Sequence, residues 1–120
     1  MKFAVTTQGP DADSLVDPRF GRAHFFRVVD CENGQQTVVD NEAGINAVQG
    51  AGIGAVRTLA DLGIQAVVTG HVGPKAWTAL QAAHIQVYGV SGETVDQAMK
   101  AFMAKQLTPL TNPNVQGHWS

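Results

Sequence analysis

The stretch IQAVVTGHVGPKAWTALQAAHIQVYGV, residues 64–90, decides the fold. It opens with a short apolar run at 64–69 that is rich in β-branched side chains, which is typical of a buried strand. Glycines and Pro74 then mark a turn and the first position of a helix, and apolar residues at helical spacing continue to Ala83. A second apolar run follows at 85–90. A strand, a helix and a strand in this order predict a crossover between two parallel strands.

The N-terminal part of the chain adds more strands. Residues 2–7 read as a short buried strand. Residues 24–30 and 36–39 are rich in aromatic and β-branched side chains and flank Asn33-Gly34, which is a strong hairpin signal. Because a hairpin makes one strand antiparallel, we expect an α/β fold with a five-stranded mixed sheet and helices on both faces, a three-layer α/β/α arrangement.

Two further helices complete the pattern. Apolar residues fall at helical spacing from about residue 43 to 62, and Gly63 is a plausible C-terminal stop. Residues 94–97 match a capping box and open the last helix. After residue 107 the chain is rich in Pro, Asn, Gly, Thr and Gln without periodicity. We therefore expect a single domain over 1–107 and a flexible C-terminal tail over 108–120.

Composition excludes several classes of function. The 120 residues carry a net charge of −2, so no general attraction to nucleic acid or to an anionic membrane is expected. The sequence has neither a signal-peptide pattern nor an apolar run approaching the ~18 residues of a membrane helix. Cys31 is the single cysteine, so no disulfide can form within the chain. A reducing, cytoplasmic location and an inert thiol are the expectations.

A cationic loop is the clearest functional signal. Two arginines and a histidine fall in the stretch DPRFGRAH, residues 17–24, which closes a long predicted loop at 8–23. The planar guanidinium groups suit an oxyanion or a polyanionic cluster. The open alternative is that the arginines pair with aspartates of the same loop, Asp11, Asp13 and Asp17.

Two other segments converge on this loop if the strands at 2–7 and 64–69 pair, because ligands bind beyond the carboxyl ends of strands in such sheets. One is residues 69–75, which lead into a helix. The other is residues 41–54, which contain Gly-x-Gly-x-Gly at 50–54. A glycine-rich helix start can bind an anion through backbone N–H groups. The spacing is not GxGxxG, and close packing of the helix remains the alternative.

Single residues refine the site. His71 follows a predicted central strand in a glycine-rich turn, where polar groups commonly contact ligands. Lys75 and His24 either face the same site or are, respectively, a solvated lysine and the start of a strand. One cysteine cannot supply an iron–sulfur cluster, and the histidines show no HxxxH or HExxH spacing. Direct ligation of a metal by the protein is therefore not predicted, and a bound metal must bring its own ligands.

Three motifs together resemble a known family. RFGRAHFF at 19–26, GAG at 50–52 and VTGHVGPKA at 68–76 are similar to motifs of the dinitrogenase iron–molybdenum cofactor biosynthesis family. The similarity extends over about residues 2–107. It implies a ribonuclease H-like α/β fold and the binding of a metal cluster without catalysis. Gln49 is a departure, since many members have histidine there, and this puts direct metal ligation at that point in doubt.

The resemblance also implies a cargo and a site. Length and the lone cysteine are similar to those of members that hold a molybdenum–copper sulfide cluster noncovalently, and other proteins are expected to deliver or receive it. A regulatory module that binds a phosphorylated small molecule is the alternative, and a Mg²⁺-dependent hydrolase is disfavoured because the first strand has no carboxylates. The expected cluster-binding residues are Arg19, Phe20, Gly21, Arg22, His24, Asn46, Gly50, Gly52, Ile53, Gly70, His71, Val72, Gly73 and Lys75.

Overall fold

The computed structural model describes residues 1–41 and 50–113. Strands and helices alternate along the chain after an initial hairpin, as the sequence predicts. The elements are β1 (Lys2–Thr7), β2 (Phe25–Asp30), β3 (Gln36–Asp40), α2 (Ala51–Asp61), β4 (Ala66–Thr69), α3 (Pro74–Ala82), β5 (Gln86–Gly89) and α4 (Val95–Met103).

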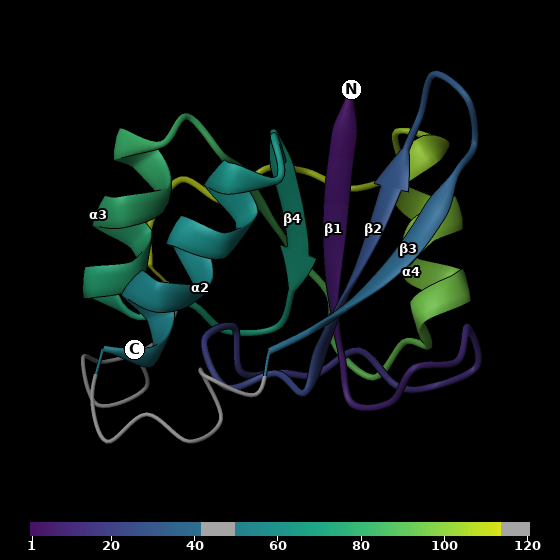
Figure 1. Cartoon of the computed structure of the whole chain (residues 1–120), viewed down its shortest axis with the longest axis horizontal. Helices are drawn as coiled ribbons and strands as arrows, with labels where there is room; N and C mark the ends of the chain where they lie inside the picture. The colour runs from purple at the N-terminus through teal and green to yellow at the C-terminus, as the bar shows by residue number, and fades with distance from the viewer. Residues whose placement is uncertain (42–49, 114–120) are drawn as a thin grey trace.

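The strands form one five-stranded mixed sheet in the order β3-β2-β1-β4-β5. β1 lies in the centre, antiparallel to β2 and parallel to β4, and β4 is parallel to β5 (Figure 1). This confirms the predicted α/β fold and its ribonuclease H-like arrangement. β1, β4 and β5 end at Thr7, Thr69 and Gly89 on the same side of the sheet, which we call the carboxyl edge.

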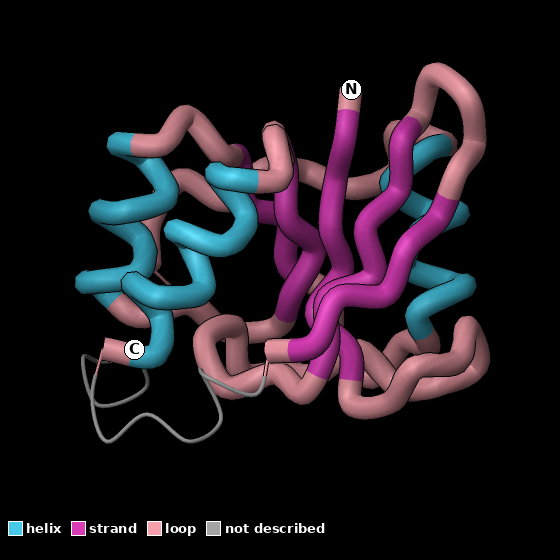
Figure 2. The backbone as a smooth tube through the Cα atoms, viewed as in Figure 1, coloured by secondary structure: helices cyan, strands magenta, loops and turns pink. Residues whose placement is uncertain are grey.

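Helices cover both faces of the sheet (Figure 2). α2 and α3 pack on one face, and α4 packs on the other. The alternation of β1 side chains fits these layers: Ala4 belongs to the core cluster under α2 and α3, whereas Phe3 and Val5 belong to the cluster under α4. Full burial of a side chain such as Phe3 contributes about 1.5–3 kcal/mol to folding.

Two boundaries differ from the prediction. α2 begins at Ala51 because Gly50 is left-handed at φ 77°, and residues 42–49, part of the predicted helix, lie outside the described residues. The segment predicted as a flexible tail contacts the sheet near its start: Pro109 bridges Tyr88, and the Leu110 N–H donates to the Val87 carbonyl at 2.7 Å. Within the described ranges, the helices are too short or too polar to cross a membrane.

Candidate functional site

The loop at 8–23 folds back across the carboxyl edge and is fastened to the central strands (Figure 1). The Asp17 N–H donates to the Thr6 carbonyl at 2.9 Å, and the Thr6 hydroxyl donates to the Asp17 carbonyl at 2.9 Å. The Thr6 hydroxyl also lies 2.7 Å from the Thr69 hydroxyl, which joins β1 to β4 under the loop. These buried hydrogen bonds fix the cationic stretch that follows directly above the central strands.

The tip of the loop pairs with the connection between β4 and α3. Arg19 and His71 form a parallel bridge, in which the Phe20 N–H donates to the His71 carbonyl at 3.2 Å and the His71 N–H donates to the Pro18 carbonyl at 2.6 Å. A Cβ atom on Gly70 would lie 2.6 Å from the Pro18 Cα atom. Glycine at position 70 therefore allows this close approach of two backbones.

The other side of the loop touches the start of α2. A Cβ atom on Gly21 would lie 2.5 Å from the Gly52 nitrogen, so the two segments are in backbone contact. Asn41, which is buried after β3, donates through Nδ2 to the carbonyl oxygens of Gly21 at 3.2 Å and Ala23 at 2.8 Å. Sequence reasoning missed this anchoring role. The available signal was a lone amide side chain directly after a strand at the carboxyl edge.

The three described helices start at this edge, and the starts of α2 and α3 differ from the start of α4, whose Val95 N–H donates to the Ser14 carbonyl of the loop at 2.8 Å. α2 and α3 have Gly50 and Gly73 at their N-caps, no side-chain cap hydrogen bond, and no acidic residue in the first turn. α4 has a complete capping box formed by Thr94 and Gln97, with Asp96 in its first turn. The first N–H groups of a helix have no partner within the helix, and among the described residues Gly50 and Gly73 supply no side chain to cap those of α2 and α3.

The loop and the first turn of α3 carry the basic residues predicted for the site. The Arg19 side chain is 46% exposed, and its Nε lies 3.9 Å from Oδ1 of Asp17, which is almost fully buried. The predicted alternative of a pair within the loop is thus present for Arg19, although at long range and with nearly half of the Arg19 side chain exposed. Arg22 is partly buried and makes interactions within the fold. His24 and Lys75 are exposed.

The apolar residues expected at the site differ in their exposure. Phe20 and Val72 are each 1% exposed and pack in the core cluster under α2 and α3, so their side chains support the site from below and do not line it. Ile53, in the first turn of α2, is 43% exposed. Asn46 lies outside the described residues.

His71 lines two cavities. One cavity of about 460 Å³ is lined by Gly70, His71, Ser91 and Glu93 among others, and a smaller one of about 270 Å³ by Pro18, His71 and Ser91 among others. Both lie toward β5 rather than over α2. The carboxyl edge therefore combines a concave surface at His71 with the cationic loop and two helix starts.

Residues 1–105 match the model of a family described as dinitrogenase iron-molybdenum cofactor. The chain belongs to this family. Members of known structure share its fold over nearly the whole chain. The apo form of the orange protein from Desulfovibrio gigas is 47% identical, with a TM-score of 0.91 and coverage of 95% of this chain and 96% of that one.

Two other relatives are more distant. A Thermotoga protein provisionally named NifB, whose structure was determined by NMR, is 34% identical, with a TM-score of 0.84 and coverage of 95% of this chain and 97% of that one. An uncharacterized protein of Methanocaldococcus jannaschii is 29% identical over 110 residues, which is 89% of each chain. The resemblance read from the motifs is confirmed, and the family indicates the binding or carriage of a metal cluster.

Proposed function

We propose that this protein binds an anionic metal–sulfide cluster noncovalently at the carboxyl edge and carries or stores it, without catalysing a reaction. One observation supports this most strongly. The arginine-bearing loop contacts the start of α2 and the connection into α3, two helices with glycine N-caps and no first-turn carboxylate, whereas the start of α4 has a capping box and donates N–H groups to carbonyls of the same loop. The family resemblance favours a cluster of the molybdenum–copper sulfide type.

The donor set suits an anion that brings its own sulfide ligands. Backbone N–H groups and a helix start, which carries about half a positive charge, stabilise negative charge nearby. Each charge-assisted hydrogen bond contributes about 1.5–3 kcal/mol. Within the described part of the chain, no group of three or more His, Cys, Asp or Glu side chains could hold a bare metal ion. Cys31, the single thiol, follows β2 at the opposite edge.

The same donors would bind phosphate, so a phosphorylated small molecule is the competing ligand class. Visible absorption separates the two, because a metal–sulfide cluster has charge-transfer bands and a phosphate ester has none. A Mg²⁺-dependent hydrolase would need several carboxylates at the strand ends. The described residues offer no such group.

The test removes the two loop arginines together, Arg19→Ala with Arg22→Ala. We expect the variant to fold but to retain at least about tenfold less cluster, because two charge-assisted contacts of about 1.5 kcal/mol or more are lost. Apo protein is mixed with tetrathiomolybdate and copper and desalted, and molybdenum, copper and visible absorption are measured per chain.

The matched control is Lys2→Ala with Arg57→Ala, which removes the same charge from exposed positions outside the site. Equal cluster retention in both double variants would reject the proposed site. Bleaching of the wild-type colour by millimolar inorganic phosphate would instead indicate that phosphate competes for the same donors.

A further inference from the structure

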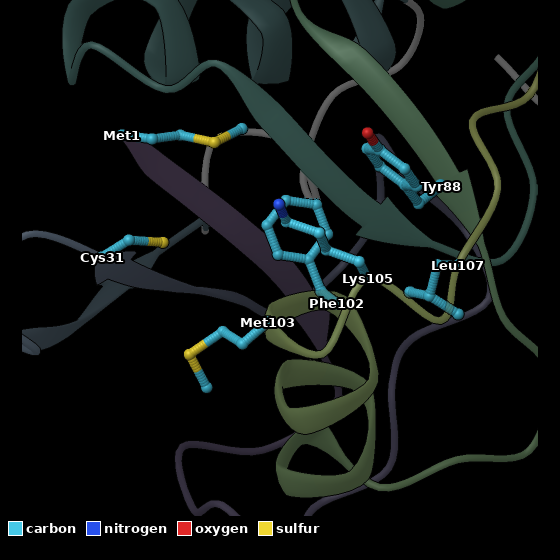
Figure 3. Close-up of a pocket in the computed structure, with 7 residues that line it drawn as sticks. All are labelled: Met1, Cys31, Tyr88, Phe102, Met103, Lys105 and Leu107. Atoms are coloured by element: carbon cyan, nitrogen blue, oxygen red, sulfur yellow. The ribbon is translucent and has the colours of Figure 1, made fainter.

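A further cavity lies away from the carboxyl edge. It has a volume of about 530 Å³ and lies where β1 begins and α4 ends (Figure 3). Its lining comes from the first residue of the chain, the residue after β2, β5, and the end of α4 with the segment that follows. These residues are Met1, Cys31, Tyr88, Phe102, Met103, Lys105 and Leu107.

Sulfur is concentrated in this cavity. The chain has one cysteine and three methionines, and three of these four residues line the cavity. The fourth, Met99, is 3% exposed and belongs to the core cluster under α4. Met1 and Met103 are 43% and 50% exposed, and Cys31 is an exposed free thiol. Three sulfur-bearing side chains around one cavity are therefore accessible to a ligand from solvent.

The backbone fixes the thiol beside one of the thioethers. The Cys31 N–H donates to the Met1 carbonyl at 2.8 Å, so the two residues lie side by side just beyond the paired ends of β1 and β2. Figure 3 shows the Cys31 sulfur directed toward the cavity, with the Met1 and Met103 side chains on either side of it. Methionine has three rotatable side-chain bonds, so both thioethers can adjust to a common ligand.

From this arrangement we propose a second site, formed by Cys31, Met1 and Met103, that binds a monovalent copper ion, Cu(I). Thiolate and thioether sulfurs are soft ligands and select Cu(I) over harder ions. On binding, the Cys31 thiol releases its proton to the buffer, and the copper stays in the +1 state.

Charge balance favours a monovalent ion. One thiolate, two neutral thioethers and Cu(I) make a neutral complex, which suits a cavity walled by Phe102 and Leu107. A divalent ion in the same ligands would leave a positive complex beside the Lys105 ammonium, which also lines the cavity. This inference does not rest on cluster carriage at the carboxyl edge.

The experiment titrates the full chain anaerobically with Cu(I) held by the chromogenic chelator bicinchoninate. We expect one Cu(I) per chain and a sulfur-only coordination shell by X-ray absorption at the copper edge. Cys31→Ser should weaken binding about 100-fold and Met103→Leu about tenfold, since each removes one soft ligand. Met99→Leu is the matched control, because it makes the same change in the same helix outside the cavity, and it should leave Cu(I) affinity unchanged.

Three outcomes would overturn the site. One is equal Cu(I) affinity in wild type and Cys31→Ser. Another is an unchanged Cu(I) affinity in Met103→Leu, which would show that the Cys31 thiol binds the ion without the Met103 thioether. The last is loss of Cu(I) binding in the Arg19→Ala, Arg22→Ala variant, which would place the copper at the carboxyl edge. Thermal unfolding of each variant confirms that it is folded, and unchanged cluster retention in Cys31→Ser separates this proposal from the proposed function.

Discussion

Gly21 and Gly70 serve the site by their size rather than by unusual backbone angles. Each lies where the cationic loop touches another backbone, Gly21 against the start of α2 and Gly70 against Pro18, and a Cβ atom would approach within 2.5–2.6 Å in both places. The structure shows a packing role for these two glycines, which the sequence analysis predicted as ligand-binding residues. Because neither position carries a side chain, the loop packs closely against the start of α2 and against the connection between β4 and α3.

Gly21→Ala should therefore destabilise the protein by about 1–3 kcal/mol, as expected for a methyl group forced against backbone that cannot move aside freely. The control is Gly54→Ala in α2, where a Cβ atom has open space. That change should stabilise the helix by about 0.5–1 kcal/mol. Urea unfolding measures both. Equal stability of wild type and Gly21→Ala would show that the loop does not pack as described.

Other residues of the site could not be predicted from the sequence. Thr6 and Thr69 share a hydrogen bond across 63 positions, and Asn41 reaches back 20 residues to Gly21. A single polar residue in or after a buried strand has no periodic signal, and its partner is set only by strand pairing. Arg19 and His71 were predictable because local composition marks them, although their direct pairing was not.

At the scale of elements, the three described helices divide into two kinds. The capping box of α4 was read from the sequence because its pattern is local. The start of α2 was not, because apolar periodicity continues upstream of Gly50 and only the left-handed conformation of that residue shows where the helix begins. Glycine at the described N-caps of α2 and α3 supplies no side-chain cap and so lowers helix stability, which is the compromise that the proposed anion site requires.

Replacing Ile53 in the first turn of α2 tests this compromise. Ile53→Glu puts a carboxylate at the helix start, where it should stabilise the fold by about 0.3–1 kcal/mol relative to Ile53→Gln, which has nearly the same shape. The same charge should repel an anionic cluster and lower its retention. Chemical denaturation and metal content of the two variants give the two effects. If glutamate raises stability but leaves retention equal to that of glutamine, the start of α2 is not part of the site.

At the scale of the whole molecule, the topology was predictable because alternating strands and helices with short connections permit few arrangements. The sulfur-lined cavity was not. Met1, Cys31 and Met103 belong to three distant parts of the sequence, and the chain pattern alone indicated an inert thiol. Strand pairing and the end of α4 bring them together at the edge opposite the cationic loop.

The two sites lie at opposite ends of the central strands, so they should act independently. β1 has six residues and spans roughly 20 Å. Sites this far apart without shared contacts usually show additive effects, within about 0.5 kcal/mol.

We expect the Arg19→Ala, Arg22→Ala and Cys31→Ser changes, combined in one chain, to reduce cluster retention and Cu(I) affinity by the same factors as in the separate variants. Full copper occupancy should likewise leave tetrathiomolybdate binding unchanged. A rigid, close-packed core predicts no coupling between the two sites. A change of about tenfold or more in either affinity when the other site is filled would therefore mean that ligand binding rearranges the sheet between its two edges.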